Sequence, residues 1–360
     1  MAFWNKKIIN LENKYFGLDI SDLSVKIFQL EKNGREDVVR SFGVKEIPSG
    51  CIENGKIINR EKVIEIIKNL FATARPEKIN TKKVICSLPE SKVFLHAVTI
   101  PKMSEEEAME AVKWEIEASI PLSVDQVYYD WQFLEEKEGK QNVLTAATVK
   151  EFVDEMCAML EESGLEVYGL EMESIALARS LVVKISQPEE VFLLVDIGAT
   201  KTSFTISERN IPYFTSSIPF SSSSITEEIA SRLALQKEEA QNLKITQGIE
   251  NSSGSNSILN AISPLLENVS VEIEKTIDFY QSMSKNNIKK VKIILTGGGA
   301  NLKGLLEYLK PKLSYEIVLG DAWINLNFGK KIPSIKQADL NRYAVSVGLA
   351  MRGADYGNKT

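Results

Sequence analysis

Apolar and polar positions follow the same layout in two stretches of the chain. Residues 191–206, VFLLVDIGATKTSFTI, begin with an apolar run, pass through a short turn that contains Gly198, and continue with alternating side chains. Residues 15–30, YFGLDISDLSVKIFQL, have the same order about half a chain earlier. Two such runs joined by a short polar turn are typical of a β-hairpin. The sequence therefore predicts two equivalent hairpins.

An amphipathic segment and then an apolar strand follow each predicted hairpin. In the first half, residues 60–71 carry apolar side chains at helical spacing, and an apolar run follows at 83–88. In the second half, the corresponding segments are 270–282 and 291–295. The repeated order predicts an α/β chain built from two similar halves.

The first half contains an additional module at 93–173. Its pattern predicts the order strand, helix, two strands, helix and strand, and Ser104 with Glu107 has the spacing of a capping box at the start of the first helix. Ser224 with Glu227 predicts another helix start in the second half. The predicted units are a first-lobe core at 1–92 and 174–188, the insertion at 93–173, a second-lobe core at 189–220 and 290–360 whose last helix packs back on the first lobe, and a helical subdomain at 221–289.

Composition narrows the functional classes. The 360 residues are 44% hydrophobic and 26% charged, which is enough for two domains with cores of their own. The net charge of −6 argues against nucleic acid as the main partner, because binding many phosphates requires a basic face. No run of about 18 apolar residues is present, so we expect no membrane span.

The cysteine and histidine content also excludes several kinds of site. Cys51, Cys86 and Cys157 share no metal-ligand spacing and leave one thiol unpaired in any disulfide scheme, which favours a reducing cytoplasm. The single histidine, His96, lies in the apolar run VFLHAVTI, where a strand residue is expected. Most histidine-based catalysis and histidine metal sites are therefore excluded.

Both hairpin turns carry groups that suit a phosphate ligand. Gly198 removes a Cβ where a backbone would approach a ligand, and Thr200 and Thr202 supply hydroxyl groups. Asp196 is suited to hold Mg²⁺ through water, and Asp19 has the equivalent position in the first hairpin. For either turn alone, an ordinary hairpin with a polar tip is the alternative.

The two hairpins and the turn TGGGANLKGL at 296–305 resemble the phosphate 1, phosphate 2 and adenosine motifs of the actin, Hsp70 and sugar kinase superfamily. The resemblance implies a two-lobed, duplicated ribonuclease H-like fold with ATP and Mg²⁺ between the lobes, where both hairpins and a glycine turn at a helix start hold the nucleotide. It assigns nucleotide contacts to Asp19, Ser21, Ser24, Lys26, Asp196, Gly198, Thr200, Lys201, Thr202, Gly297, Gly298 and Gly299, with Asp19 and Asp196 holding Mg²⁺ through water.

The insertion is similar to one branch of that superfamily. Residues 114–131, WEIEASIPLSVDQVYYDW, resemble the WExE..IP signature of the type IV pilus assembly protein PilM family, and the module resembles the 1C subdomain that this family shares with FtsA. The segment EIEKTIDFY also matches, with Glu272 and Lys275 facing the ribose and adenine. The resemblance implies a cytoplasmic, ATP-binding protein that docks the tail of the inner-membrane protein PilN in a groove between subdomains 1A and 1C.

Two departures from the family pattern concern the phosphate loops. Ser21 and Asp22 replace the usual glycine and Thr/Ser of the first turn, which puts a carboxylate near the expected β-phosphate and should weaken ATP binding unless Mg²⁺ or Lys26 compensates. Ser222 and Ser223 replace a glycine pair in the second lobe.

The sequence does not settle whether ATP is hydrolysed, and two other classes of protein remain as alternatives. We find no position that convincingly supplies a residue to orient the attacking water, and Glu115 and Glu117 fit the outer surface of the insertion helix better. At most weak ATP hydrolysis is therefore expected, with ATP acting as a ligand that closes the lobes. An FtsA-like filament protein is disfavoured by the lack of a C-terminal amphipathic helix, and a ROK-like sugar kinase by the central position of DIGATKT. Self-association remains open.

Overall fold

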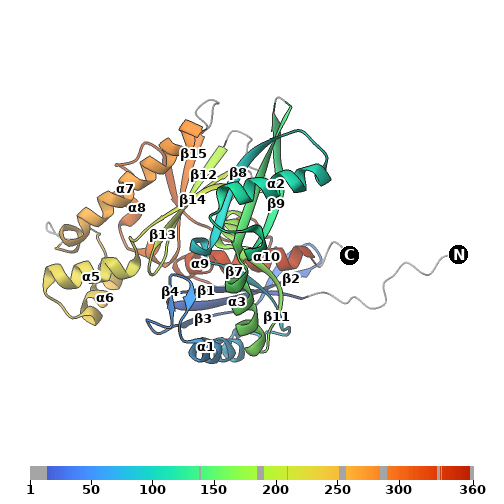
Figure 1. The fold of residues 1–360 in the computed structure, drawn as a ribbon. Coiled ribbons are helices and arrows are strands. Elements are labelled where there is room, and N and C mark those ends of the chain that lie inside the picture. The colour runs from blue at the N-terminus through green and yellow to red at the C-terminus, as the bar shows by residue number, and fades with distance from the viewer. Residues whose placement is uncertain are drawn as a thin grey trace.

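The computed structural model describes residues 14–137, 139–184, 190–208, 210–250, 257–283, 290–330, 333 and 335–356. Each of the predicted units therefore includes residues that lie outside the described part. Two α/β lobes stand side by side, and a smaller module rises from the first lobe beside strand β14 of the second (Figure 1). No helix within the described residues combines the length and the hydropathy needed to span a membrane.

The first lobe is built on a six-stranded sheet with the order β11-β7-β1-β2-β3-β6. The strands β1, β2 and β3 are antiparallel, whereas β7 and β11 continue the sheet in parallel. Helices α1 and α3 pack on one face of the sheet, and α4 and α10 cover the other. The bounds are β1 (Phe16–Ser21), β2 (Ser24–Asn33), β3 (Glu36–Glu46), α1 (Arg60–Thr73), β6 (Arg75–Pro76), β7 (Lys83–Leu88), α3 (Lys150–Glu162), β11 (Glu166–Met172), α4 (Glu173–Leu181) and α10 (Ala344–Tyr356).

The second lobe repeats this topology in the order β14-β13-β12-β15-β16. Its strand β12 pairs antiparallel with β13 and parallel with β15, just as β1 pairs with β2 and β7. The two hairpins and the duplication predicted from the sequence are therefore present. The bounds are β12 (Glu190–Ile197), β13 (Thr202–Glu208), β14 (Ile211–Ile218), α5 (Ser222–Leu233), α6 (Lys237–Thr246), α7 (Ser257–Met283), β15 (Lys290–Thr296), η3 (Gly298–Asn301), α8 (Leu305–Leu309), β16 (Glu316–Leu319) and α9 (Gln337–Arg342).

The insertion is shorter than the predicted 93–173. It consists of β8 (Val93–Pro101), α2 (Glu105–Ser119), η2 (Val124–Gln126), β9 (Val127–Lys137) and β10 (Lys140–Val149), with a sheet in the order β8-β10-β9. The predicted last helix and strand of this module belong to the first lobe, because β11 pairs with β7 and because Met156, Met159 and Leu160 of α3 are buried in the first-lobe core. The α2 capping box is present, with Ser104 N donating to Glu107 at 2.9 Å.

Helix α5 begins earlier than the sequence predicts. Ser221 is the N-cap, and its hydroxyl accepts a hydrogen bond from Ser224 N at 3.1 Å, while Ser221 N donates to the Ser224 hydroxyl at 2.8 Å. In the usual capping box, a Glu or Gln side chain at N3 accepts a hydrogen bond from the N-cap backbone N–H; here the Ser224 hydroxyl accepts that bond. The prediction of Ser224 as N-cap, with Glu227 three residues later, was wrong by one turn.

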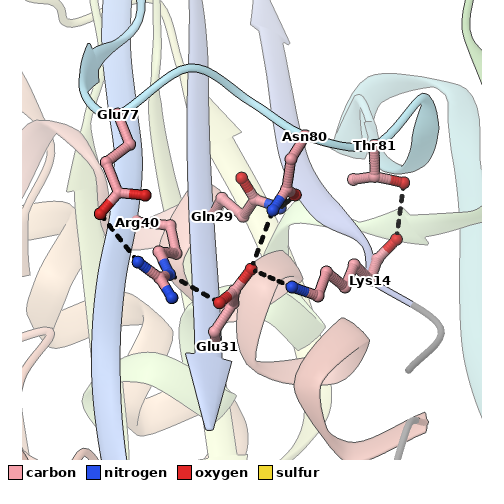
Figure 2. A network of polar contacts seen from close by, with 7 residues as sticks. All are labelled: Lys14, Gln29, Glu31, Arg40, Glu77, Asn80 and Thr81. Carbon is pink, nitrogen blue, oxygen red and sulfur yellow. Dashed lines mark hydrogen bonds and ion pairs between the residues drawn. The ribbon is translucent and has the colours of Figure 1, made fainter. Parts of the chain in front are cut away.

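A polar network holds the end of the first-lobe sheet that lies opposite the β1–β2 turn (Figure 2). Its centre is the Glu31 carboxylate, which bonds Lys14 at 2.9 Å, Arg40 at 2.6 Å and Asn80 at 3.2 Å. Burial raises the pKa of Glu31, but these hydrogen bonds outweigh it, and the net pKa is lowered. Thr81 donates to Lys14 O at 2.8 Å, so the network also fixes the first described residues of the chain.

Candidate functional site

The turns of the two hairpins face each other between the lobes. Thr200, in the β12–β13 turn, donates its hydroxyl to Asp22 Oδ2 of the β1–β2 turn at 3.1 Å. The charges of Asp19 and Lys26 from the first lobe act on the pKa of Asp196 in the second. Residues predicted from two distant parts of the sequence therefore meet at one site between the lobes, hereafter the cleft.

Asp19 lies near the end of β1, where contacts with other side chains fix its position. Its side chain is buried, Lys26 Nζ lies 2.8 Å from Oδ2, and Ser87 donates to Oδ1 at 3.3 Å. Ser87 in turn accepts a hydrogen bond from Ile20 N at 3.1 Å, which fixes its orientation. The ion pair with Lys26 and the hydrogen bond from Ser87 therefore hold the Asp19 side chain in one orientation between the lobes.

Asp196 occupies the equivalent place at the end of β12, against the glycine turn. Gly297 has a φ of +81°, and a Cβ there would overlap the Asp196 carboxylate, so only glycine allows this approach. Burial, followed by the negative charge of Asp19, raises the pKa of Asp196 to about 6, while Lys26 and Lys201 act in the opposite direction. The two lysines therefore do not offset the effects of burial and of Asp19 on the pKa of Asp196.

Glu173 adds a third acid that the sequence analysis missed. It is the first residue of α4, and burial raises its pKa to about 8; Lys201 lowers it, whereas Asp19, Glu90 and Asp196 raise it further. Its place at the start of α4 makes it a candidate for orienting an attacking water, a role for which the sequence offered no convincing residue. Glu115 and Glu117 are exposed on α2 of the insertion. The sequence signal that could have identified Glu173 is an acidic residue at the point where a strand passes directly into a helix.

This charge distribution suits a divalent cation with few protein ligands. Within the described residues, no group of three or more Asp, Glu, His or Cys has the arrangement of a metal site. Raised carboxylate pKa values nevertheless mark negative charge that a cation would stabilise. Mg²⁺ keeps several waters and commonly binds one or two carboxylates together with phosphate oxygens. The residues therefore fit a hydrated Mg²⁺ that arrives with a phosphate ligand.

Hydroxyl groups of the turns differ in their availability. The Thr202 hydroxyl is buried and donates to Phe220 O at 2.8 Å, so it points into the second lobe. Ser21 donates to Ser24 O at 3.0 Å and closes the first turn. Thr200 is exposed at the tip of the second turn.

The backbone of the second turn is tied to the start of α5. Gly198 N donates to Lys201 O at 2.9 Å, and a Cβ on Gly198 would lie only 2.9 Å from that oxygen. Ser222 N and Ser223 N donate to Gly198 O and Ala199 O at 3.0 and 3.1 Å. These backbone bonds do not depend on glycine, so the serine pair is compatible with an ordered phosphate loop.

The glycine turn follows β15 and closes the second-lobe side of the cleft. Gly297 N donates to Asn341 O at 3.2 Å, and a Cβ on Gly299 would overlap the Ile197 side chain. Gly298 is the exposed member of the three. Helix α6 adjoins this turn, because Ile249 N donates to Lys303 O at 2.9 Å and Lys303 Nζ donates to Thr246 O at 2.6 Å.

The predicted ribose and adenine contacts, Glu272 and Lys275, lie on α7, the helix on which the sequence analysis places them. Glu272 and Lys275 pair with each other at 3.8 Å on α7, which packs on α5 and β13, and the Lys275 side chain is 68% exposed. Lys244 of α6 is instead buried and donates to Ser222 O and to the Ser222 and Thr226 hydroxyls at 2.7–2.8 Å. Burial lowers the pKa of Lys244 to about 8. It is a further cation beside the start of α5, whose Ser222 is hydrogen-bonded to Gly198 of the second hairpin turn.

Two lobes of equal topology that each direct a hairpin turn into a shared cleft define an actin-like fold. Comparisons with known proteins agree. A family model described as type IV pilus assembly protein PilM matches residues 17–354. This chain belongs to the type IV pilus assembly protein PilM family.

Solved structures place the fold in the same group. A PilM–PilN type IV pilus biogenesis complex contains a chain with a TM-score of 0.77 and 26% identity, over 96% of this chain and 99% of that chain. The ethanolamine utilization protein EutJ of Carboxydothermus hydrogenoformans has a TM-score of 0.58 at 14% identity, covering 94% and 89%. MreB5 of Spiroplasma citri, solved with ADP, has 0.53 at 13% identity, covering 97% and 98%. At these low identities, EutJ and MreB5 support the fold alone.

Proposed function

We propose that this protein is a cytoplasmic, ATP-binding scaffold of the type IV pilus assembly machinery that holds the tail of a PilN-like inner-membrane protein. The observation that carries the nucleotide part is the convergence of Asp19, Asp196 and the glycine turn on one cleft between the lobes. The PilM–PilN complex supports the choice of partner. The protein would then be held at the inner face of the membrane by this partner.

The cleft offers a separate contact to each part of Mg·ATP. The phosphates would lie between the β1–β2 turn and the turn at 198–201, beside Lys26 and Lys201. Asp19 and Asp196 would bind waters of Mg²⁺, which when bound neutralises charge on the phosphate oxygens. The turn at 297–299 and the buried Lys244 would flank the adenosine.

Glu173 is the residue that would orient an attacking water. It stands at the start of α4 beside both aspartates, and with a pKa of about 8 it retains its proton over much of the neutral range. A protonated carboxyl is a poor base, so we expect slow turnover unless Mg·ATP lowers this pKa. ATP would then act mainly as a ligand that biases the closure of the lobes.

The proposed partner groove extends from the junction of the insertion with the first lobe onto the insertion itself. A hollow of about 140 Å³ is lined by Ser91, Lys92, Val93, Phe94, Val149 and Phe152. A second hollow of about 410 Å³ lies between β8, β10 and the end of α2, and its lining includes Phe94, His96, Ile116 and Ile120. Phe94 borders both hollows and is 43% exposed. Apolar side chains of an extended peptide would fill these hollows.

Replacing Phe94 with aspartate is expected to weaken binding of the partner tail at least about tenfold, because a charge would line both hollows. Binding of Mg·ATP should not change, since Phe94 is outside the cleft. Fluorescence anisotropy with a labelled synthetic tail peptide of the PilN-like partner measures the first effect, and calorimetry the second.

Trp114→Asp is the matched control for this variant. Trp114 is 69% exposed on α2 and lines neither hollow. If Phe94→Asp binds the tail normally and Trp114→Asp binds it more weakly, the docking site lies on the outer face of α2 and not in these hollows.

Replacing Asp22 with serine is expected to strengthen Mg·ATP binding severalfold. The Asp22 carboxylate accepts hydrogen bonds from Gly55 N, Asn54 N and the Thr200 hydroxyl at 2.9, 3.2 and 3.1 Å. Serine removes a negative charge near the phosphates and releases Thr200, and at a partly exposed site this change is worth ~1 kcal/mol. Calorimetric titration measures the change; weaker binding would show that the link to Thr200 preorganises the cleft for the nucleotide.

A further inference from the structure

One short turn connects the cleft to the proposed groove. The turn η1 (Glu90–Lys92) joins β7, which lies beside β1, to β8 of the insertion. Its residues Ser91 and Lys92, and Val93 directly after it, line the smaller hollow. Any movement of this turn therefore changes the wall of the groove.

Glu90 fastens this turn to the start of α4 by reciprocal hydrogen bonds. Glu90 N donates to Glu173 Oε2 at 3.2 Å, and Ser174 N donates to Glu90 Oε2 at 3.3 Å. Glu173 is the acid that faces Asp19 and Asp196. Glu90, directly before the residues that line the smaller hollow, thus contacts the start of α4, which contributes Glu173 to the cleft.

Glu90 is also reached from the second lobe. The Thr215 side chain of β14 and the Ser174 side chain both lower the pKa of Glu90, although burial has the larger effect and raises it. Oε1 of Glu90 is buried without a hydrogen bond of good geometry within the described part of the chain. An incompletely bonded buried carboxylate is costly, so a small shift of β14 that completes this bond changes its free energy appreciably.

We propose that Glu90 couples nucleotide occupancy of the cleft to the affinity of the groove. Closure of the lobes on Mg·ATP brings the Thr215 hydroxyl fully onto the Glu90 carboxylate, which fixes η1 and preorganises the first hollow for the partner tail. This inference rests on the proposed function, because it requires both ligands. By linkage, the tail strengthens nucleotide binding by the same factor as the nucleotide strengthens tail binding.

The test is a thermodynamic cycle with the full chain. The affinity for the labelled synthetic tail peptide is measured with and without saturating Mg·AMPPNP, an analogue that excludes turnover. In the unaltered protein we expect the nucleotide to strengthen tail binding about fivefold or more. Thr215→Val, which preserves the shape of the side chain and removes its hydroxyl, should reduce this factor to about one, while the affinity for Mg·AMPPNP alone stays within about twofold.

Two further variants sharpen the test. Ser217→Ala removes a hydroxyl two residues further along β14, at an exposed position, and should keep the full coupling factor. Glu90→Ala removes the carboxylate itself and should lose the coupling, as Thr215→Val does.

The outcomes separate this inference from the proposed function. Retained coupling in Thr215→Val, or equal loss in Ser217→Ala, overturns the role of Glu90 and leaves the scaffold function standing. No effect of Mg·AMPPNP on tail binding in the unaltered protein overturns the inference together with the nucleotide-biased part of the proposed function.

Discussion

Replacement of Asp196 by alanine is expected to abolish Mg·ATP binding, with a loss of affinity of at least about a hundredfold, or ~2.7 kcal/mol. Asp196 stands at the end of the central strand of the second lobe, against the glycine turn. In the proposed complex it binds waters of Mg²⁺ and thereby anchors the phosphates. Removing it leaves Asp19, which Lys26 already neutralises in part, as the remaining carboxylate anchor.

The control for this experiment is Asp278→Ala. Asp278 is an exposed aspartate on α7 of the same lobe, so this variant loses the same charge at a distance from the cleft. Calorimetric titration measures binding, and thermal unfolding of each nucleotide-free variant shows that the fold is intact. The Asp196 variant should be at least as stable as the unaltered protein, because it loses a buried carboxylate whose pKa is raised to about 6.

Retained micromolar binding by the Asp196 variant would place the nucleotide elsewhere. Absence of binding in the unaltered protein would have a different meaning. It would show that Ser21 and Asp22 disable the first phosphate loop, so that the scaffold holds its partner without nucleotide.

The elements that were predictable from sequence are those specified by local patterns. Alternation of apolar residues gave both hairpins, and the acidic residue at the end of each first strand identified Asp19 and Asp196. The assignment of these two distant segments to one cleft came from the resemblance of the hairpins and the glycine turn to the phosphate and adenosine motifs of the actin, Hsp70 and sugar kinase superfamily. The capping box at Ser104 was predictable from a local pattern, since it depends on residues only three apart.

What the sequence did not reveal depends on contacts between distant segments. An apolar strand pattern does not state which sheet the strand joins, so β11 was assigned to the insertion although it pairs with β7. Helical spacing does not show which charged residues a helix buries against its neighbour, and the buried Lys244 of α6 was therefore missed. Glu173 was missed because its environment arises only when the start of α4 approaches both hairpins.

The stability of the nucleotide-free protein is expected to fall as the pH rises from about 4.5 to about 8, and Glu173→Gln should remove much of this dependence. Burial, with the charges of Asp19, Glu90 and Asp196, raises the pKa of Glu173 from its ordinary 4.5 to about 8 against the opposing effect of Lys201. Between these values the folded protein keeps a proton that the unfolded chain has lost. The free energy of unfolding therefore decreases with pH across this window, and the loss is complete above about pH 8.

Denaturant unfolding at about pH 5 and about pH 8.5 measures this difference. The two proteins should have similar stability at the lower pH, and Glu173→Gln should be more stable by several kcal/mol at the higher pH, since each pKa unit corresponds to ~1.4 kcal/mol. Glu117→Gln, at an exposed position on α2, should leave the curve unchanged. Parallel pH curves for Glu173→Gln and the unaltered protein would contradict the expectation.

The same unfolding measurement with saturating Mg·ATP tests whether the loss of stability on ionisation of Glu173 is related to nucleotide binding. A bound cation favours the ionised form of nearby carboxylates, so the pKa values of Glu173 and Asp196 should fall and the decline of stability with pH should become shallower. If the buried acid did not interact with the ligand, Mg·ATP would not change its pKa or the pH dependence of the free energy of unfolding. Strong stabilisation by Mg·ATP at high pH, reduced in Glu173→Gln, would therefore show that the acidic cluster is maintained for the cation and its nucleotide.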